Sequence, residues 1–224
     1  MALKAVGFDI DGTLYPDFRA RWRSLPFFLA HFRTILAFSR TRKLMRSRHQ
    51  DSVPDESAAD LEVAYFADER GCSMEKARNI RDRILYQEWE SCFRGMRIYP
   101  DVRESLMKLK MNGLKLAVLS DFPVGRKLEY FGLDGIFDVI LGFPDSGWLK
   151  PRPEPFLRMA EELNIEPKEI LYIGNRLDYD VRGAENAGMR GALIGPPGDK
   201  APADVTTYSD YRQMAGSILT EVVK

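Results

Sequence analysis

Residues 8–14, with the sequence FDIDGTL, constrain this chain more than any other segment, because they place two carboxylates at the end of a short apolar run. The run at residues 5–8 has the composition of a buried strand. In an extended backbone, residues i and i+2 point to the same side, so Asp9 and Asp11 are predicted to project together. Two carboxylates in one small space are costly unless a cation or a reacting phosphate lies between them. An acidic turn after a strand has the same local composition, so partners elsewhere in the chain must decide between the two interpretations.

Composition excludes several classes of protein. At 224 residues the chain suits one large domain, or a domain that carries an insertion. A formal net charge of zero argues against wholesale binding of nucleic acid. Cys72 and Cys92 have no metal-ligand spacing, which favours reduced thiols in a cytoplasmic protein. The start of the chain lacks a signal-peptide pattern, and the apolar stretch at residues 26–39 is too short and too interrupted by charge to span a membrane.

Apolar runs alternate with helical patterns from residue 99 onward. Together with a first strand near residues 4–8, buried strands are predicted at residues 115–119, 139–141, 170–173 and 192–194. Helices are predicted at residues 102–111, 125–131, 154–163 and 180–187, with Gly113, Gly132 and Gly188 placed as C-terminal caps. This alternation predicts a parallel sheet with helices on both faces.

Residues 16–95 break the alternation, since they contain no convincing strand and read as three or four helices. Gly71 is predicted to end one helix and Ser73 to cap the next. The chain is therefore predicted to consist of a core formed by residues 1–15 and 96–224 and a helical insertion formed by residues 16–95.

Charge is segregated within the insertion. A basic segment at residues 19–48 precedes an acidic segment at residues 51–69, and aromatic residues are interleaved with the cations. The pattern favours two antiparallel helices with complementary surfaces, and most of the aromatic residues are expected to form the core of the insertion. Contact between the basic segment and an anionic substrate, lipid surface or partner stays open. The basic residues are Arg19, Arg21, Arg23, Arg33, Arg40, Arg42, Lys43, Arg46 and Arg48; the acidic ones are Asp51, Asp55, Glu56, Asp60, Glu62, Asp68 and Glu69; the aromatic ones are Trp22, Phe27, Phe28, Phe32 and Phe38.

Three further motifs follow predicted strands. Ser120 and Asp121 end the strand at residues 115–119, where a hydroxyl and loop amides can donate to phosphate. Lys150 precedes a proline-rich helix start that fixes its direction, so its ammonium can offset charge on a carboxylate and a phosphoryl group. Asn175 and Asp180 follow the strand at residues 170–173. Ligands of such sheets bind at the carboxyl ends of the strands, so all four motifs are predicted to converge on one crevice.

The four motifs and their order resemble those of the haloacid dehalogenase (HAD) superfamily, which consists mostly of phosphatases. The motifs are DxDGTL, the strand-ending Ser-Asp, KPxPxxF, and Gly174-Asn175 followed by Asp180 and VRGAENAGM. The resemblance implies a Rossmann-like, doubly wound α/β core with an α-helical cap of the C1 type. It departs from the family pattern at one position, because Asn175 stands where the family usually has the first aspartate of its fourth motif.

The resemblance also implies roles for individual residues. Asp9 would be the nucleophile and Asp11 the general acid and base, with Lys150 completing the catalytic set. The substrate phosphate would be bound by Thr13, Ser120, Asp121 and Lys150. Mg²⁺ would be bound by Asp9, Asp11, Asn175 and Asp180, with Asp178 as an alternative source of the second acid.

The function predicted from this resemblance is Mg²⁺-dependent hydrolysis of a small phosphorylated metabolite through an aspartyl-phosphate on Asp9. A dehalogenase and a phosphotransferase would use the same scaffold, and the substitution at Asn175 leaves open a weakly catalytic or non-catalytic interaction protein. The identity of the substrate and the oligomeric state do not follow from the sequence.

Overall fold

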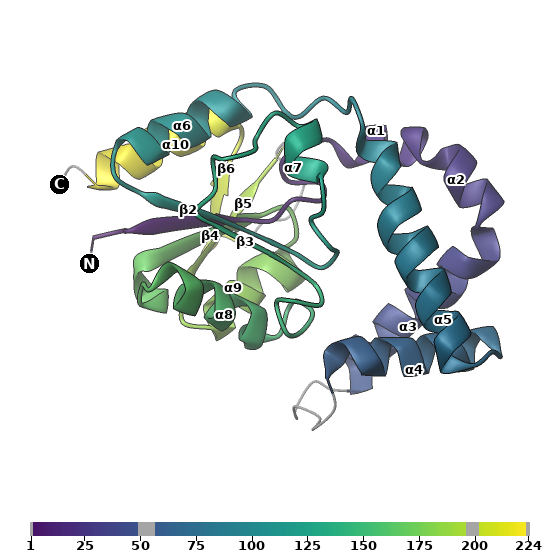
Figure 1. Cartoon of the computed structure of the whole chain (residues 1–224). Helices are drawn as coiled ribbons and strands as arrows, with labels where there is room; N and C mark the ends of the chain where they lie inside the picture. The colour runs from purple at the N-terminus through teal and green to yellow at the C-terminus, as the bar shows by residue number, and fades with distance from the viewer. Residues whose placement is uncertain (1, 49–56, 196–201, 223–224) are drawn as a thin grey trace.

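The computed structural model describes residues 2–48, 57–195 and 202–222, and within them the centre of the molecule is a parallel sheet of six strands in the order β3-β2-β1-β4-β5-β6 (Figure 1). The predicted doubly wound α/β fold with a helical insertion between the first two strands is confirmed. The strands are β1 (Ala5–Phe8), β2 (Lys115–Ser120), β3 (Val139–Gly142), β4 (Ile170–Gly174), β5 (Arg190–Ile194) and β6 (Thr206–Tyr208).

Strand β1 lies at the centre of the sheet, where Phe8 is in register with Val118 of β2 and Ile173 of β4. All four residues of β1 are buried, as expected of a strand covered on both faces. Five of these strands were predicted. Strand β6 was not, because it has only three residues and begins with two exposed threonines, so no apolar run marks it.

Helices cover both faces of the sheet. Helices α6 (Val102–Met111) and α10 (Tyr211–Val222) cover one face, and α8 (Pro153–Leu163) and α9 (Arg182–Asn186) cover the other (Figure 1). The core also contains α7 (Lys127–Tyr130), the 3₁₀ turn η3 (Pro167–Glu169) and the π-helical turn η4 (Leu177–Val181). Helix α6 has the predicted bounds, whereas α10 was not predicted. The three predicted cap glycines have positive φ angles of 85°, 67° and 78°, which a side chain would disfavour.

The insertion lies beside the carboxyl ends of the strands (Figure 1). It contains more helical elements than the predicted three or four, because single residues, Ser24 and His31, interrupt its first part. Gly71 ends α4 in a left-handed conformation and the Ser73 hydroxyl caps α5, as predicted. The elements are α1 (Asp17–Arg23), α2 (Leu25–Ala30), α3 (Phe32–Arg48), α4 (Ala58–Arg70), α5 (Met74–Ile80), the π-helical η1 (Arg81–Glu88) and the 3₁₀ turn η2 (Ser91–Phe93).

The basic and acidic segments of the insertion meet where α3 packs on α4. Arg40 pairs with Glu69 at the surface, and the buried Arg42 pairs with the fully buried Glu62. Asp51, Asp55 and Glu56 of the acidic segment lie outside the described residues. Phe27 and Phe38 are buried, as expected of insertion core, whereas Trp22 and Phe32 are exposed.

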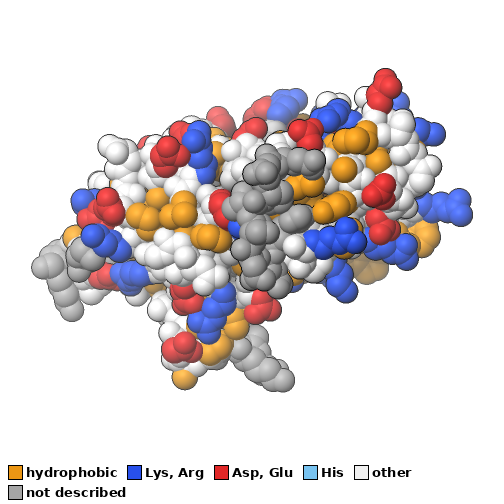
Figure 2. Space-filling model, turned by 90° about the horizontal axis from the view of Figure 1, so that it is seen from below, with side chains coloured by type: hydrophobic (Ala, Val, Ile, Leu, Met, Phe, Trp, Pro, Cys, Tyr) orange, Lys and Arg blue, Asp and Glu red, His pale blue; other side chains and the backbone are white. Residues whose placement is uncertain are grey.

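The surface carries both signs of charge. Acidic and basic side chains are interspersed over the face shown in Figure 2, in keeping with the zero net charge of the chain. Among the described residues, no helix has the length and apolar character that crossing a membrane requires.

Candidate active site

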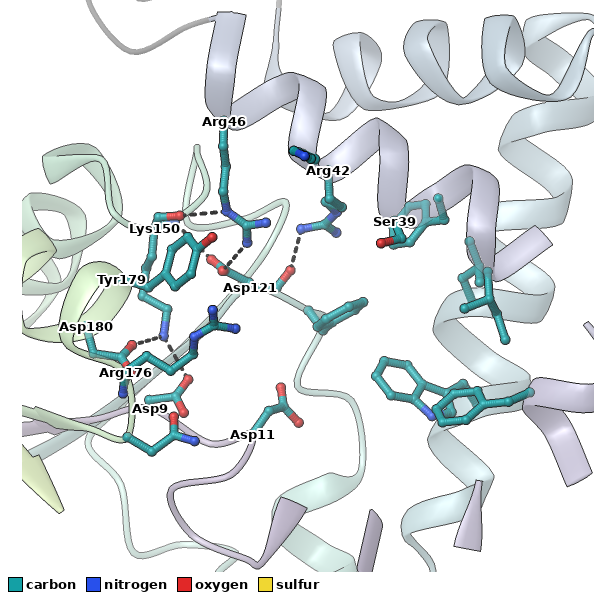
Figure 3. Close-up of a pocket in the computed structure, with 18 of the residues that line it drawn as sticks. Asp9, Asp11, Ser39, Arg42, Arg46, Asp121, Lys150, Arg176, Tyr179 and Asp180 are labelled. Atoms are coloured by element: carbon teal, nitrogen blue, oxygen red, sulfur yellow. Dashed lines mark hydrogen bonds and ion pairs between the residues drawn. The ribbon is translucent and has the colours of Figure 1, made fainter. Parts of the chain in front are cut away.

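A cavity of about 690 Å³ lies between the carboxyl edge of the sheet and the insertion (Figure 3). The turn after β1 contributes Asp9 and Asp11 to its lining, and the loop after β2 contributes Asp121. Lys150, Asn175 and Asp180 also line the cavity, together with polar side chains of the insertion and of the loop after β4. The structure therefore brings the four motifs together at one crevice, as the strand order requires.

Lys150 is the centre of a buried cluster of charges. Its Nζ lies 2.7 Å from Oδ1 of Asp9 and 2.6 Å from Oδ1 of Asp180, and all three side chains are almost inaccessible to solvent. The hydroxyl of Tyr172 lies 3.3 Å from the same ammonium and donates to the carbonyl of Leu119. Lys150 is thereby fixed between two carboxylates that would otherwise repel each other.

Asp11 faces a second lysine. The Nζ of Lys127 donates to Oδ1 of Asp11 at 2.8 Å, and Tyr15 donates to the same oxygen. Ser120 donates to Oδ2 at 3.0 Å and accepts a hydrogen bond from the amide of Phe122. The two aspartates line one cavity, but each has its own ammonium partner.

These surroundings separate the pKa values of the two carboxyl groups. Burial raises the pKa of Asp9 to about 7, because the neighbouring Asp180 and Asp11 add to the effect of desolvation and Lys150 only partly offsets it. Burial acts in the same direction on Asp11, but Lys127 and the hydrogen bonds from Tyr15 and Ser120 lower its pKa below the ordinary value. Burial alone would lower the pKa of Lys150, and Asp180 and Asp9 instead hold it well above its usual range.

The carboxylate of Asp121, a predicted phosphate ligand, is occupied by protein donors. Its Oδ1 accepts from the main-chain amide of Lys150 at 2.9 Å, and its Oδ2 accepts from Arg46 of α3 at 2.7 Å. Arg46 also donates to the carbonyl of Lys150, and Arg42 donates to the carbonyl of Asp121 (Figure 3). Asp121 therefore joins the core to the insertion.

Asn175 and Asp180 both reach the cluster, whereas Asp178 is exposed on η4. The hydroxyl of Thr13 donates to Asp9 at 2.7 Å and lies 3.4 Å from Oδ1 of Asn175, so it bridges the first and fourth motifs. Oδ2 of Asp180 accepts from the amide of Arg176 at 3.0 Å. A Cβ on Gly174 would lie 2.3 Å from the carboxyl carbon of Asp180, so only glycine allows Asp180 this position.

A protein-family model for haloacid dehalogenase-like hydrolases matches residues 3–188 of the chain. The chain belongs to this family. Among curated proteins, this hydrolase is 31% identical over 205 residues to the glyceraldehyde 3-phosphate phosphatase of Methanopyrus kandleri, covering 84% of this chain and 82% of the relative. It is 28% identical over 195 residues to a phosphoglycolate phosphatase of Haemophilus influenzae, covering 86% of this chain and 84% of the relative.

Solved structures of the family share the fold along the whole chain. A HAD phosphatase from Thermococcus onnurineus has a TM-score of 0.65 and 25% identity, covering 98% of this hydrolase and 99% of that chain. A 2-haloacid dehalogenase from Pseudomonas syringae has a TM-score of 0.67 and 20% identity, covering 97% and 98%. At that identity the second comparison shows the fold alone.

Sequence reasoning about this hydrolase missed the partners of Asp11 and of Asp121. Lys127 belongs to a predicted helix in which nothing distinguishes it from a solvated lysine, yet it is only 2% exposed. Arg42 and Arg46 were grouped with a basic segment, and their spacing of four residues places them on one face of α3. That spacing was the available signal for two arginines that reach the same loop.

The residues present fit a magnesium ion through oxygen donors. Among the described residues, no group of three or more His, Cys, Asp or Glu side chains is arranged to hold a metal. Asp9 and Asp180 nevertheless share Lys150, and Thr13 links Asp9 to the amide oxygen of Asn175, so two carboxylates and one amide carbonyl are close together. Such hard oxygen donors suit Mg²⁺.

Proposed function

We propose that this hydrolase is a phosphatase that cleaves small phosphate monoesters through an aspartyl-phosphate on Asp9. The observation that carries the proposal is the buried Lys150, whose ammonium binds both Asp9 and Asp180 while Asp11 lines the same cavity. The named activities of the relatives, a glyceraldehyde 3-phosphate phosphatase and a phosphoglycolate phosphatase, support the same reaction class.

In the first step, a carboxylate oxygen of Asp9 attacks phosphorus and the bond between phosphorus and the ester oxygen breaks. The electron pair goes to the departing oxygen, which takes a proton from Asp11. Lys127 keeps Asp11 ionised in the free site, so the proton is acquired when the anionic phosphoryl group arrives and raises the pKa of Asp11. Lys150 stabilises the charge on Asp9 and on the phosphoryl oxygens.

In the second step, Asp11 takes a proton from water, whose oxygen attacks phosphorus while the bond to Asp9 breaks. The base in this step is the Asp11 carboxylate that donation of the proton to the leaving oxygen has left behind. When phosphate departs, Lys127 again lowers the pKa of Asp11, and the proton is released to solvent, which returns Asp11 to the ionised form of the free site. The Ser120 hydroxyl and the amides of its loop are the proposed donors to the phosphoryl oxygens.

Mg²⁺ would be held by Asp9, Asn175, Asp180 and the main chain at Asp11, and it would supply neutralisation of charge on the phosphoryl oxygens. Because Asn175 removes one negative charge from this set, affinity for the ion is expected to be lower than with two acids at that loop.

The reaction is tested by measuring phosphate release from a panel of monoesters with and without Mg²⁺, in parallel with halide release from a 2-haloacid. Phosphate release that disappears in Asp9→Asn, together with a phosphoryl mass increment on Asp9 after rapid acid quenching, is the expected result. Halide release without phosphate release would replace the phosphatase assignment with a dehalogenase, for which a leaving-group proton from Asp11 has no use.

A further inference from the structure

The wall of the cavity next to Asp11 is aromatic. Phe28 of α2 lies 6.3 Å from Trp89, Trp89 lies 4.9 Å from Phe122, and Phe122 lies 6.3 Å from Phe38 of α3, measured between ring centroids. All four residues line the cavity. They form a continuous surface that runs from the insertion to the loop after β2.

Lys127 fixes this wall relative to the reacting groups. Its Nζ lies 2.8 Å from Asp11 and 5.6 and 5.7 Å from the ring centroids of Trp89 and Phe122. The Asp9 side of the cavity is instead bounded by Lys150 and Asp180. In the proposed reaction Asp11 protonates the departing oxygen, so whatever that oxygen carries extends toward the rings and away from the polar cluster.

Two of the arginines that line the cavity are already engaged by the protein. Arg42 pairs with Glu62 and donates to the carbonyl of Asp121, and Arg46 bonds Asp121 and the carbonyl of Lys150. Figure 3 shows Arg42 directed at Asp121, and Arg46 directed at Asp121 and Lys150. A leaving group with its own carboxylate would have to compete for these two arginines or reach Lys43 or Arg176, which also line the cavity, whereas an apolar one needs none of these cations.

We propose that the cavity selects phosphate monoesters whose leaving group is an alkyl chain or ring, a substrate class that rests on the proposed phosphatase function. Burial of such a group against the rings contributes about a fourfold gain in kcat/KM for each methylene removed from water. The gain ends when the chain exceeds the length of the wall.

The test compares kcat/KM for ethyl, butyl and hexyl phosphate with that for phosphoglycolate, in Mg²⁺, for the parent and two variants. Phe28→Ala removes part of the wall, and Leu29→Ala is the matched control, since Leu29 is the next residue on α2 and is 72% exposed. We expect kcat/KM to rise with the length of the alkyl chain in the parent and in Leu29→Ala, and to depend much less on chain length in Phe28→Ala. The melting temperature of each variant confirms that it is folded.

The outcomes are distinct. Activity on all esters with no dependence on chain length, or a preference for phosphoglycolate that survives in Phe28→Ala, would overturn the substrate class and leave the phosphatase standing. No phosphate release from any ester would overturn the proposed function and this inference with it.

A different surface carries a second proposal. Six large apolar side chains on α1, α2 and the start of α3 are exposed, and four of them have more than half of their area accessible: 60% for Phe18, 73% for Trp22, 72% for Leu29 and 62% for Phe32. The other two are Leu25 and Leu36. The six recur at the helical spacing of three and four residues along three consecutive helices, of which α2 lies on the outer side of the insertion (Figure 1). Six large exposed apolar side chains on one short stretch of chain are more than scattered surface residues, and such a concentration is typical of an interaction site.

The charge beside this face has one predominant sign. Within residues 17–40, the exposed charged side chains are those of Asp17, Arg19, Arg21, Arg23, Arg33 and Arg40. Arg21 lies 3.8 Å from Asp17, and Arg40 lies 3.8 Å from Glu69. A second copy docked on this face by a twofold axis would bring arginines against arginines, whereas an anionic lipid surface would be complementary to them.

We infer that the face docks on the surface of an anionic phospholipid bilayer. Cosedimentation with vesicles of phosphatidylglycerol and phosphatidylcholine is expected to exceed that with phosphatidylcholine alone, and to fall about tenfold in Trp22→Ser combined with Phe32→Ser. Met111→Ser is the matched control, because Met111 is 81% exposed on α6, outside the face. Equal binding by all three proteins, or a dimer that the double variant dissociates while vesicles bind neither protein, would overturn the inference.

Discussion

Replacing Asp9 with asparagine is expected to stabilise the metal-free protein while abolishing turnover. Asp9 is only 5% exposed, and desolvation raises its pKa from 3.8 to about 7 although Lys150 opposes the rise. The folded chain therefore binds a proton at this group between about pH 4 and pH 7, where the unfolded chain has released it. Stability contributed by Asp9 falls as the pH rises through this window and levels off above it.

The magnitude follows from the two pKa values. Each unit between the folded and unfolded values corresponds to about 1.4 kcal/mol, so the gap between 3.8 and about 7 corresponds to about 4 kcal/mol. Asparagine has no proton to release in either state. The advantage of Asp9→Asn in free energy of unfolding should therefore grow by about 4 kcal/mol between about pH 4 and pH 8.

The assay is urea unfolding followed by circular dichroism in EDTA, at several pH values across this window. Asp178→Asn gives the background for the same chemical change on an exposed aspartate of η4. A difference between Asp9→Asn and the parent that is constant with pH, or a parent that is the more stable protein at about pH 8, would refute the assigned electrostatics of the cluster.

Three further substitutions separate the parts of the site. Lys127→Met removes the main cause that lowers the pKa of Asp11, which must carry a proton in the first step, so the basic limb of the kcat/KM profile should move to higher pH with a loss of about 10- to 100-fold; an unmoved limb would contradict the pairing. Asn175→Asp adds a carboxylate beside Asp9, and Mg²⁺ titration of activity should show about tenfold tighter binding, whereas unchanged or weaker binding would place the ion elsewhere. Arg42→Met leaves the fully buried Glu62 without its closest cation and should lower the free energy of unfolding, measured in urea, by about 3 kcal/mol. Arg40→Met removes a surface pair and should change the free energy of unfolding by less than about 0.5 kcal/mol, so equal effects of the two substitutions would contradict this account.

The sheet could be predicted from the sequence where local patterns are strong. Strand β1 is buried on both faces and therefore appears as a continuous apolar run, and the glycines at 113, 132 and 188 mark helix ends through their positive φ angles. Strand β6 could not be predicted, because its short threonine-rich segment becomes a strand only by pairing with β5.

The convergence of the four motifs followed from the topology, but the contacts made between distant segments did not. Lys127 reaches Asp11 across 116 residues of chain, and Arg46 reaches Asp121 across 75. A lysine or arginine in a helix is usually solvated, so neither partner has a local signature. Asp121 was predicted as a phosphate ligand from its place after β2, and its carboxylate instead accepts hydrogen bonds from two protein donors.

Asp121 has a consequence for how the cavity can open. The carboxylate of Asp121 accepts hydrogen bonds from the main-chain amide of Lys150, the residue whose side chain binds Asp9, and from the guanidinium of Arg46 in the insertion. Any movement of the insertion away from the sheet would have to separate Arg46 from Asp121, together with the hydrogen bonds from Arg42 and Arg46 to the carbonyls of Asp121 and Lys150. We expect added salt to weaken this partly exposed pair more than the buried charges around Lys150, which are screened far less.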